Sequence, residues 1–367
     1  MELVPEKKKQ HFVPRFYLKN FSNNLNKKTI GVFNLERERF IVHGDLKNQA
    51  YKDYFYGKDG EIESELGKIE TEASKIFNKI IEECYVPTYL SESHIVLLIF
   101  TIFLAVRTEY SADTQNEILD KMVKTIFKDD PRVKDELDKI VIEYTNPSAF
   151  ILSIVASIIP ITFDLKYKLI VNNTDCLFIT SDNPVIRYNQ FLEKRKPYGS
   201  NVGFATKGLQ LFLPINPKMF LIFYDDSTYK VGNKKDSVVL INDEKDVKAL
   251  NVLSCVNAYK NIYFNHQFNE SMIREIYNKA KKYRKEQKAS VDEYRSIENE
   301  NSSLIHLYER DIRINLKLSF IKELKKAKGF KIGNRVVHVR NEKLLDAVEE
   351  FRKEFAIKNF NSNKINQ

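Results

Sequence analysis

The sequence of 367 residues has few cysteines and no long apolar run. Its three cysteines, Cys84, Cys176 and Cys255, are far apart and odd in number, which offers no disulfide or metal-site spacing and is typical of reduced thiols in the cytoplasm. The longest apolar stretches, residues 95–106 and 149–163, are shorter than the roughly 18 residues that a membrane-spanning helix needs. The charged N-terminus also lacks the apolar run of a secretory signal. We therefore expect a cytoplasmic protein with no membrane partner.

Glycine-rich and histidine-rich signatures are missing too. There is no Walker loop, no dinucleotide-binding glycine pattern and no Gly-x-Ser-x-Gly segment. No two histidines have the spacing of zinc ligands, which leaves no predicted metal site. We expect structural or exposed roles for five of the six: His43, His94, His266, His306 and His338. The sequence therefore names no cofactor.

What the sequence does have is an uneven distribution of positive charge. The net charge is +9, and residues 270–367 carry 23 Lys and Arg against 15 Asp and Glu, whereas residues 1–269 carry 36 against 35. A basic C-terminal third on a nearly neutral body suggests a polyanionic partner such as nucleic acid. The alternative is a general bias of composition, because Lys, Asn and Ile are abundant throughout.

Periodicity predicts an α+β fold with a largely helical N-terminal half packed on a mixed or antiparallel sheet. We expect two regions, an α+β core domain over residues 1–266 and a basic, mainly helical C-terminal region over residues 267–367. Helices are predicted at residues 61–83, 95–106, 116–127, 133–144, 147–159, 243–258, 271–288 and 342–355. Strands are predicted at residues 29–35, 39–43, 166–172, 175–180, 210–214, 219–224, 237–242, 262–265 and 331–339, with a loop over 289–303.

The segment over residues 7–22 is the first candidate for a site. Pro14 restricts the residue before it to extended backbone and is a good first residue for a short helix. His11 and Arg15 would then lie on either side of a helix N-terminus, where free amides favour an anion. The alternative is that the aromatic residues of this segment anchor the N-terminus and that His11 is buried.

Residues 176–185 form the second candidate. An apolar stretch leads directly into Ser181, Asp182, Asn183 and Pro184. Polar residues at the end of a buried strand are held rigidly, and Asp182 is a candidate base, metal ligand or partner for a histidine. The alternative is a turn in which Ser181 and Asp182 accept hydrogen bonds from backbone amides ahead of the proline.

Several motifs in residues 10–266 resemble the bacterial DUF4238 family. The family's opening pattern, His-x-x-Pro-x-x-Tyr-Leu-x-x-Phe, is matched over residues 11–21, and its Phe-Ile-Thr-Ser-Asp-Asn-Pro-Val segment over residues 178–185. The family also has a helix that contains Leu-x-x-Ile-Glu, matched here by Leu66, Ile69 and Glu70. It further has an apolar helix that ends in Arg-Thr, matched by Arg107 and Thr108. The pair Arg107-Thr108 usually leads into proline in the family, whereas here Glu109 follows.

The resemblance implies no established reaction, but some members are similar to phage-defence proteins. Together with the residue types it suggests a phosphodiester-directed site in which His11 moves a proton, Arg107 stabilises negative charge and Asp182 orients the histidine. Arg15, Ser181 and Asn183 are the expected substrate-binding residues. The leading hypothesis is a defence nuclease, with RNA as the favoured substrate. The alternative is a non-catalytic sensor or binding module in which the same motifs stabilise the core.

Overall fold

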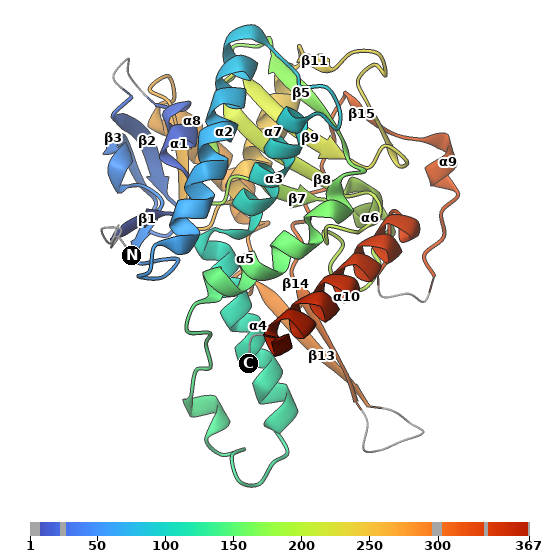
Figure 1. Ribbon diagram of the computed structural model, residues 1–367. Helices are drawn as coiled ribbons and strands as arrows, with labels where there is room; N and C mark the ends of the chain where they lie inside the picture. Colours follow the sequence, from blue (N-terminus) through green and yellow to red (C-terminus); the bar gives the residue numbers. More distant parts are fainter. Residues whose placement is uncertain (1–7, 23–26, 296–302, 334–336, 366–367) are drawn as a thin grey trace.

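Helices are the commonest elements of the first half of the chain and pack on a mixed sheet, in agreement with the α+β fold that the sequence predicts (Figure 1). The computed structural model describes residues 8–22, 27–295, 303–333 and 337–365. The helices of the first half are α1 (Arg15–Lys19), α2 (Glu61–Glu83), α3 (Glu92–Val106), α4 (Glu109–Phe127) and α5 (Pro147–Ile158), with short 3-10 turns η1 (Leu46–Asn48), η2 (Leu137–Lys139) and η3 (Ile159–Thr162).

Helices α2 and α3 follow directly from their apolar patterns. In α2, Leu66, Ala73, Phe77 and Ile80 recur at helical spacing and are all buried. Helix α3 is apolar on nearly every side and lies among α2, α5 and the sheet, in the largest core cluster. Ser91 begins it by accepting a hydrogen bond from the backbone amide of His94, as its position predicts.

Two sheets carry the rest of the core. The larger has the order β11-β5-β9-β8-β7, in which only the β11–β5 pair is parallel. The smaller is antiparallel, with the order β3-β2-β12-β6. Their strands are β2 (Thr29–Asn34), β3 (Arg39–Asp45), β5 (Lys166–Asn172), β6 (Thr180–Ser181), β7 (Ile186–Tyr188), β8 (Gln210–Asn216), β9 (Met219–Tyr224), β11 (Val238–Ile241) and β12 (Asn261–Phe264).

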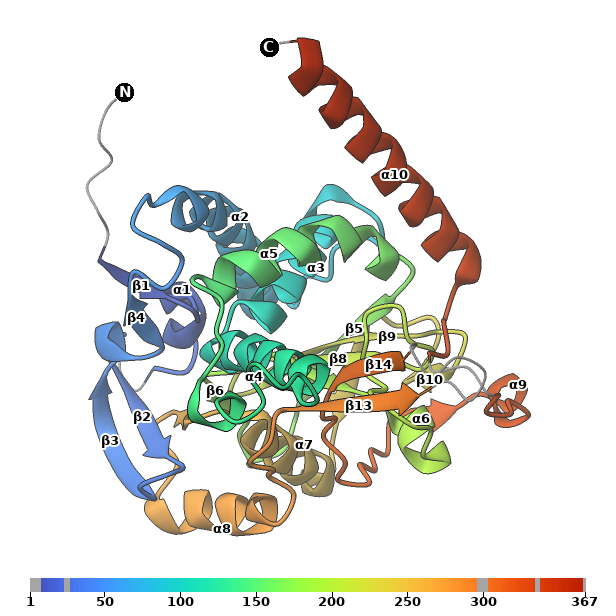
Figure 2. The same cartoon turned by 90° about the horizontal axis from the view of Figure 1, so that it is seen from below.

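Three further strand pairs are antiparallel and two-stranded. They are β1 (Lys9–His11) with β4 (Tyr51–Asp53), β10 (Tyr229–Val231) with β15 (Ile321–Glu323), and β13 (Ala289–Arg295) with β14 (Ser303–Glu309). The remaining helices are α6 (Gln190–Arg195), α7 (Glu244–Asn257), α8 (Glu270–Lys281), α9 (Lys325–Lys328) and α10 (Glu342–Ile365). Figures 1 and 2 show α10 projecting from the body of the molecule.

The C-terminal region shares its buried surface with the rest of the chain. Leu316, Leu318 and Ala327 are buried in the core cluster on one face of the larger sheet, and Ile273 and Tyr277 of α8 are buried against the smaller sheet. The division at residues 266 and 267 stays a prediction. The structure gives the region after it extensive apolar contact with the region before it.

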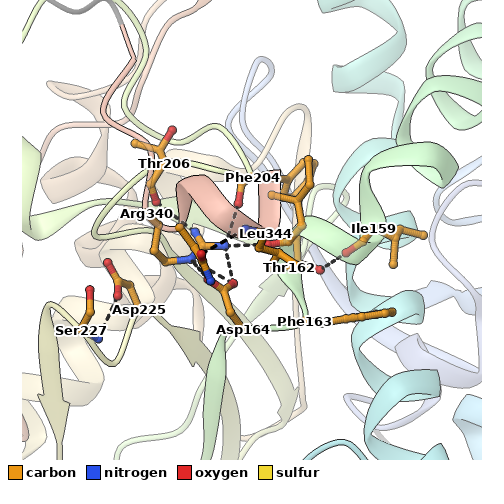
Figure 3. Close-up of polar contacts among 12 residues, drawn as sticks. Ile159, Thr162, Phe163, Asp164, Phe204, Thr206, Asp225, Ser227, Arg340 and Leu344 are labelled. Atoms are coloured by element: carbon orange, nitrogen blue, oxygen red, sulfur yellow. Dashed lines mark hydrogen bonds and ion pairs between the residues drawn. The ribbon is translucent and has the colours of Figure 1, made fainter. Parts of the chain in front are cut away.

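Arg340 fastens the start of α10 to the core (Figure 3). Its guanidinium group, 3% exposed, contacts the Asp164 carboxylate at 2.7 Å and donates to the backbone oxygens of Ile161, Phe204 and Thr206 at 3.0–3.1 Å. A buried arginine with this many acceptors is a structural residue. Arg340 therefore anchors the C-terminal helix where η3 meets β5.

Some predicted elements are wrong for identifiable reasons. Residues 133–144 form turns and η2, because Asp120 and Asn116 of α4 accept the amides of Ile142 and Tyr144 at 3.0 and 3.1 Å. Residues 176–179 are not a strand, because the side chain of Asn251 bonds both Leu177 O (2.7 Å) and Ile179 N (3.1 Å).

Three differences concern the C-terminal region. Helix α8 ends at Lys281 rather than at residue 288, and the predicted loop contains β13 instead. Residues 304–328, which we expected within a mainly helical region, contain β14, β15 and a four-residue helix. The strand predicted over 331–339 lies partly outside the described residues, and Val339 forms an isolated bridge with Thr206.

Among the described residues, no single helix is both long and apolar enough to cross a bilayer. Helices α3 and α4 reach that length and hydropathy only as a pair, and they are bent by 55° at their junction.

Candidate functional site

Arg107 ends α3 and holds the N-terminal segment in place. Its guanidinium group donates to the backbone oxygens of His11 (3.0 Å) and Phe12 (3.2 Å) and forms a 2.6 Å ion pair with Glu70. The Arg107 side chain is only 2% exposed. Because its hydrogen bonds go to the protein itself, Arg107 acts as a clamp between β1, α2 and α3.

The His11 ring lies at the outer side of this segment. Its Nε2 is 3.2 Å from the backbone oxygen of Lys47, and its ring centre is 5.7 Å from that of Tyr51. Arg15 is exposed on α1, which has only five residues. The predicted short helix is present, but it begins one residue later than predicted, because Pro14 is its N-cap in extended backbone (φ −59°, ψ 139°). The structure therefore joins Arg107 to the backbone of His11 and not to its imidazole.

Asp182 is buried beneath a turn that follows α7. Its two carboxylate oxygens accept the backbone amides of Tyr259, Lys260 and Asn261 at 2.7–2.9 Å. Burial raises the pKa of Asp182 to about 6, and the three amide donors act in the opposite direction. The carboxylate thus fixes the shape of the turn after α7, whereas the turn alternative expected it to accept amides of its own segment ahead of Pro184.

Ser181 and Asn183 belong to the same bonded group. Asn183 and Asn257 exchange side-chain-to-backbone hydrogen bonds at 3.0 and 2.5 Å, which joins the segment after β6 to the end of α7. Thr108, the N-cap of α4, lies 3.2 Å from the Asn183 side-chain oxygen, and Ser181 accepts the Asn183 amide at 3.1 Å. We call Thr108, Ser181, Asp182, Asn183 and Asn257 the motif frame.

A basic pocket of about 470 Å³ lies against this frame. It is formed by the N-terminal end of α4, the end of α7 with its following turn, residues 283–288 after α8, and residues 310–312 after β14. Figure 2 shows these elements converging where α4, α7 and β13 meet. The basic side chains in its lining are Lys260, Arg284, Lys285, Lys288 and Arg310, and the acidic ones are Glu36, Glu286 and Asp311.

Two of the basic residues and one acid have structural partners. Arg284 donates to the backbone oxygens of Cys255 (2.9 Å), Ala258 (2.6 Å) and Tyr259 (2.8 Å), where it stabilises the C-terminal end of α7. Lys260 forms a 2.6 Å ion pair with Glu109. Among the acidic residues, Asp311 is buried, and its carboxylate accepts hydrogen bonds from the Ser200 hydroxyl and the Asn201 backbone amide.

The other three basic residues leave positive charge at the pocket. Lys285 and Arg310 are exposed, and the ammonium group of Lys288 lies 3.9 Å from the Glu117 carboxylate, which is a long distance for an ion pair. Burial, followed by the nearby Arg313 and Arg310, lowers the pKa of Lys285. A bound anion would relieve this repulsion.

Two tyrosines add aromatic surface. The Tyr110 and Tyr259 rings pack edge to face with centres 5.7 Å apart. The ammonium groups of Lys260 and Lys288 lie 5.0 and 5.3 Å from the centre of the Tyr259 ring. Burial, and then a 2.5 Å hydrogen bond to Asp113, raise the pKa of Tyr259. The pocket therefore combines cations with aromatic rings.

Among the described residues, no group of three or more His, Cys, Asp or Glu side chains is arranged to hold a metal ion. The donors that line the pocket are mostly ammonium and guanidinium groups, which suit an anion and not a cation.

Comparison with known proteins places the chain in a family. Residues 9–268 match a family model described as "Protein of unknown function (DUF4238)". The chain belongs to the DUF4238 family. Neither the curated proteins nor the solved structures gave a match. The match to the DUF4238 model includes the whole motif frame but ends before Lys285, Lys288 and Arg310.

Within this DUF4238 protein, the predicted residues thus fall into separate groups. Ser181, Asp182 and Asn183 meet at the motif frame, Arg107 joins the backbone of His11, and Arg15 is exposed on α1. Sequence analysis missed the pocket residues of the C-terminal region. The sequence feature that could have identified them is the mixture of basic and aromatic residues at 281–288. These residues were instead predicted as part of a charged helix.

Proposed function

We propose that this protein binds nucleic acid, with RNA favoured, and that the basic pocket receives phosphate and a base of the bound strand. The observation that carries the proposal is the position of Lys285, Lys288 and Arg310 around the Tyr110–Tyr259 pair. Cations that track a phosphate backbone, combined with aromatic rings on which bases stack, are the usual features of single-strand binding sites. The excess of positive charge in the sequence supports the same partner.

The motif frame gives the pocket its rigidity in this proposal. Asp182 holds the turn that carries Tyr259 and Lys260, and Asn183 holds the end of α7. A binding site works best when its side chains are fixed before the ligand arrives, because less conformational entropy is lost. The family motifs would therefore act as positioning residues, which favours a binding module over a catalytic group made of those residues.

Cleavage by His11, Arg107 and Asp182 stays a prediction, as does a role in phage defence. The contacts of Arg107 and Asp182 favour binding, because their charged groups already bond the protein's own backbone. The same incubation that measures binding also reports cleavage, since the integrity of the RNA can be followed on a gel. Cleavage that disappears in His11→Ala at an unchanged melting temperature would support the nuclease hypothesis.

The direct test is fluorescence anisotropy of a labelled single-stranded RNA with the full chain and with Lys285→Ala/Arg310→Ala. A charge-assisted contact contributes roughly 1.5–3 kcal/mol, so we expect the affinity to fall at least about tenfold. The slope of log affinity against log salt should become less steep by about 1.4, because each lost phosphate contact removes about 0.7. The matched control is Lys68→Ala/Arg132→Ala, which removes the same charge from exposed positions outside the pocket. Equal affinities of the two double variants would contradict the proposal.

A further inference from the structure

A second basic surface lies away from the motif frame, around a cavity of about 820 Å³. Its lining contains two aspartates, Asp226 and Asp236, against six lysines. We call it the lysine groove, and its lysines are Lys166, Lys168, Lys230, Lys234, Lys235 and Lys326. Figure 1 shows β15 and α9, which border it, at the right-hand side of the molecule.

The ribbon of β10 and β15 brings like charges together. Lys230 and Lys322 are direct partners in the antiparallel register, and both side chains are exposed. Side chains at such positions have Cβ atoms about 4.5–5.5 Å apart, and like charges there destabilise the pair. The repulsion between Lys230 and Lys322 lowers the stability of the folded protein. An anion bound to both ammonium groups would remove this repulsion.

The acidic residue on β15 does not neutralise these lysines. Glu323 forms a 2.6 Å ion pair with Arg195 and is 4.0 Å from Lys194 on the α6 side. Within the described ranges, no carboxylate lies within ion-pair distance of Lys230, Lys322 or Lys326. The groove therefore keeps its positive charge in the folded protein.

Two of the groove's lysines, Lys166 and Lys168, lie on β5 of the larger sheet. Lys168 on β5 donates to the backbone oxygens of Asn233 (2.7 Å) and Asp236, which fastens the turn that carries Lys234 and Lys235. Lys166 on the same strand lies over the Tyr89 ring, 3.1 Å from its centre. Exposed ammonium groups on a fixed turn suit an extended chain of phosphates.

The positive surface continues beyond this cavity. Lys326 also lines a neighbouring cavity of about 440 Å³, together with Lys207 and Phe330. The Lys207 ammonium lies 3.2 Å from the Ser227 hydroxyl and 5.9 Å from the centre of the Phe330 ring. The lysines thus extend over a path longer than one phosphate.

We infer that the lysine groove binds the phosphate backbone of single-stranded nucleic acid without regard to sequence. Lysine presents a point charge rather than the flat two-pronged donor of arginine, and phosphate contacts position a strand but carry no sequence information. A hollow lined by lysines favours a strand over an anionic bilayer, whose surface is broad and flat. The inference deepens the proposed function, on which it rests, by giving the bound strand a second contact surface.

The test compares Lys230→Ala/Lys322→Ala with the wild-type chain in the RNA anisotropy assay. We expect at least a fivefold loss of affinity, following from two lost phosphate contacts, and a salt slope less steep by about 1.4. Because the variant removes a repulsion, its melting temperature should be equal to or higher than that of the wild type. Lys68→Ala/Lys75→Ala, which removes two exposed lysines from α2, is the matched control.

The outcomes separate the inference from the proposed function. If Lys230→Ala/Lys322→Ala keeps the wild-type affinity for RNA and Lys285→Ala/Arg310→Ala loses it, the inference about the lysine groove is wrong. The proposed function of the basic pocket then stands. Absence of RNA binding by the wild type overturns both. Binding to phosphatidylserine vesicles that the groove variant alone loses, at unchanged RNA affinity, overturns the inference in favour of a membrane. If the variant folds poorly, Lys234→Ala/Lys235→Ala on the exposed turn decides: loss of affinity supports the groove and wild-type affinity overturns it.

Discussion

Arg107 and Arg310 show how differently two regions of this molecule use the same side chain. Arg107 is buried, donates hydrogen bonds to two backbone oxygens and forms an ion pair with Glu70. All of these partners belong to the protein itself. Arg310 is exposed at the basic pocket, where its Nε donates to the Ser290 hydroxyl at 2.9 Å. A guanidinium group that the protein has already satisfied stabilises the fold, whereas one that faces a pocket is able to meet a ligand. Residues in family motifs are therefore not automatically the ones that bind.

The largest expected effect is on stability, from Arg107→Met. Removing the guanidinium group leaves the Glu70 carboxylate and two buried oxygens without their partner, which costs about 3–5 kcal/mol when a buried ion pair is broken on one side. Urea unfolding of the variant measures this loss. Under conditions where the variant is folded, its RNA affinity should stay close to that of the wild type. A stable variant that has lost RNA binding would show that Arg107 meets the ligand.

Asp182→Asn is expected to have the next largest effect, and it depends on pH. The pKa of Asp182 in the folded state, about 6, lies above the ordinary aspartate value of 3.8, so between these values the native state binds more protons than the unfolded state. The stability of the wild type should therefore fall as the pH rises from about 4 to about 6, by on the order of 3 kcal/mol for this group. Asparagine lacks this titration, and it offers one oxygen where three amides need an acceptor.

Urea unfolding at several pH values between 4 and 7 checks this prediction. The variant should be less stable than the wild type throughout, and the difference should shrink as the pH rises. A difference that grows with pH would mean that the Asp182 pKa is lowered in the folded protein, and would contradict the effect of its burial.

The hydroxyl group and the ring of Tyr259 are expected to have different roles, the first in stability and the second in RNA binding. Tyr259→Phe removes the hydroxyl that bonds Asp113 and keeps the ring. We expect a loss of about 1 kcal/mol in stability, typical of one hydrogen bond, with RNA affinity unchanged within about twofold. Tyr259→Ala removes the ring and should weaken RNA binding by roughly 1–3 kcal/mol, the contribution of stacking one base. Equal binding by both variants would exclude stacking on this ring.

Sequence periodicity predicted the long helices and about half of the strands, because these elements depend on neighbouring residues. It did not predict the short elements α6, α9, β1, β4, β7 and β10. Helix α2 was predicted with its bounds at Glu61 and Glu83, and the short helix α1 was predicted to begin at Pro14, one residue before its observed start at Arg15. The predicted helix over residues 133–144 failed because Asn116 and Asp120, some twenty or more residues away, accept its amides. Such side-chain capture of backbone groups leaves no periodic signal.

The candidate site was harder to predict than the fold. The polar residues at 181–183 were identified, and the turn alternative describes the contact of Ser181 with the Asn183 amide. It does not describe Asp182, whose carboxylate accepts the amides of residues 259–261. The pocket beside them depends on four segments that are separated in sequence, around Tyr110, Tyr259, Lys285 and Arg310. Arg284 joins two of these segments, because its guanidinium group donates to backbone oxygens at the end of α7 from a position just after α8. The distribution of charge along the sequence identified the basic C-terminal region, but it did not predict that this region meets α4 and the end of α7.

The most direct test of the central claim titrates labelled single-stranded RNA into two variants side by side. Lys285→Ala/Arg310→Ala removes charge from the basic pocket, and His11→Ala removes the first residue of the family's opening motif. With both melting temperatures close to that of the wild type, the account predicts a loss of affinity in the pocket variant and none in His11→Ala. The reverse result, with RNA binding lost in His11→Ala and kept in the pocket variant, would contradict it.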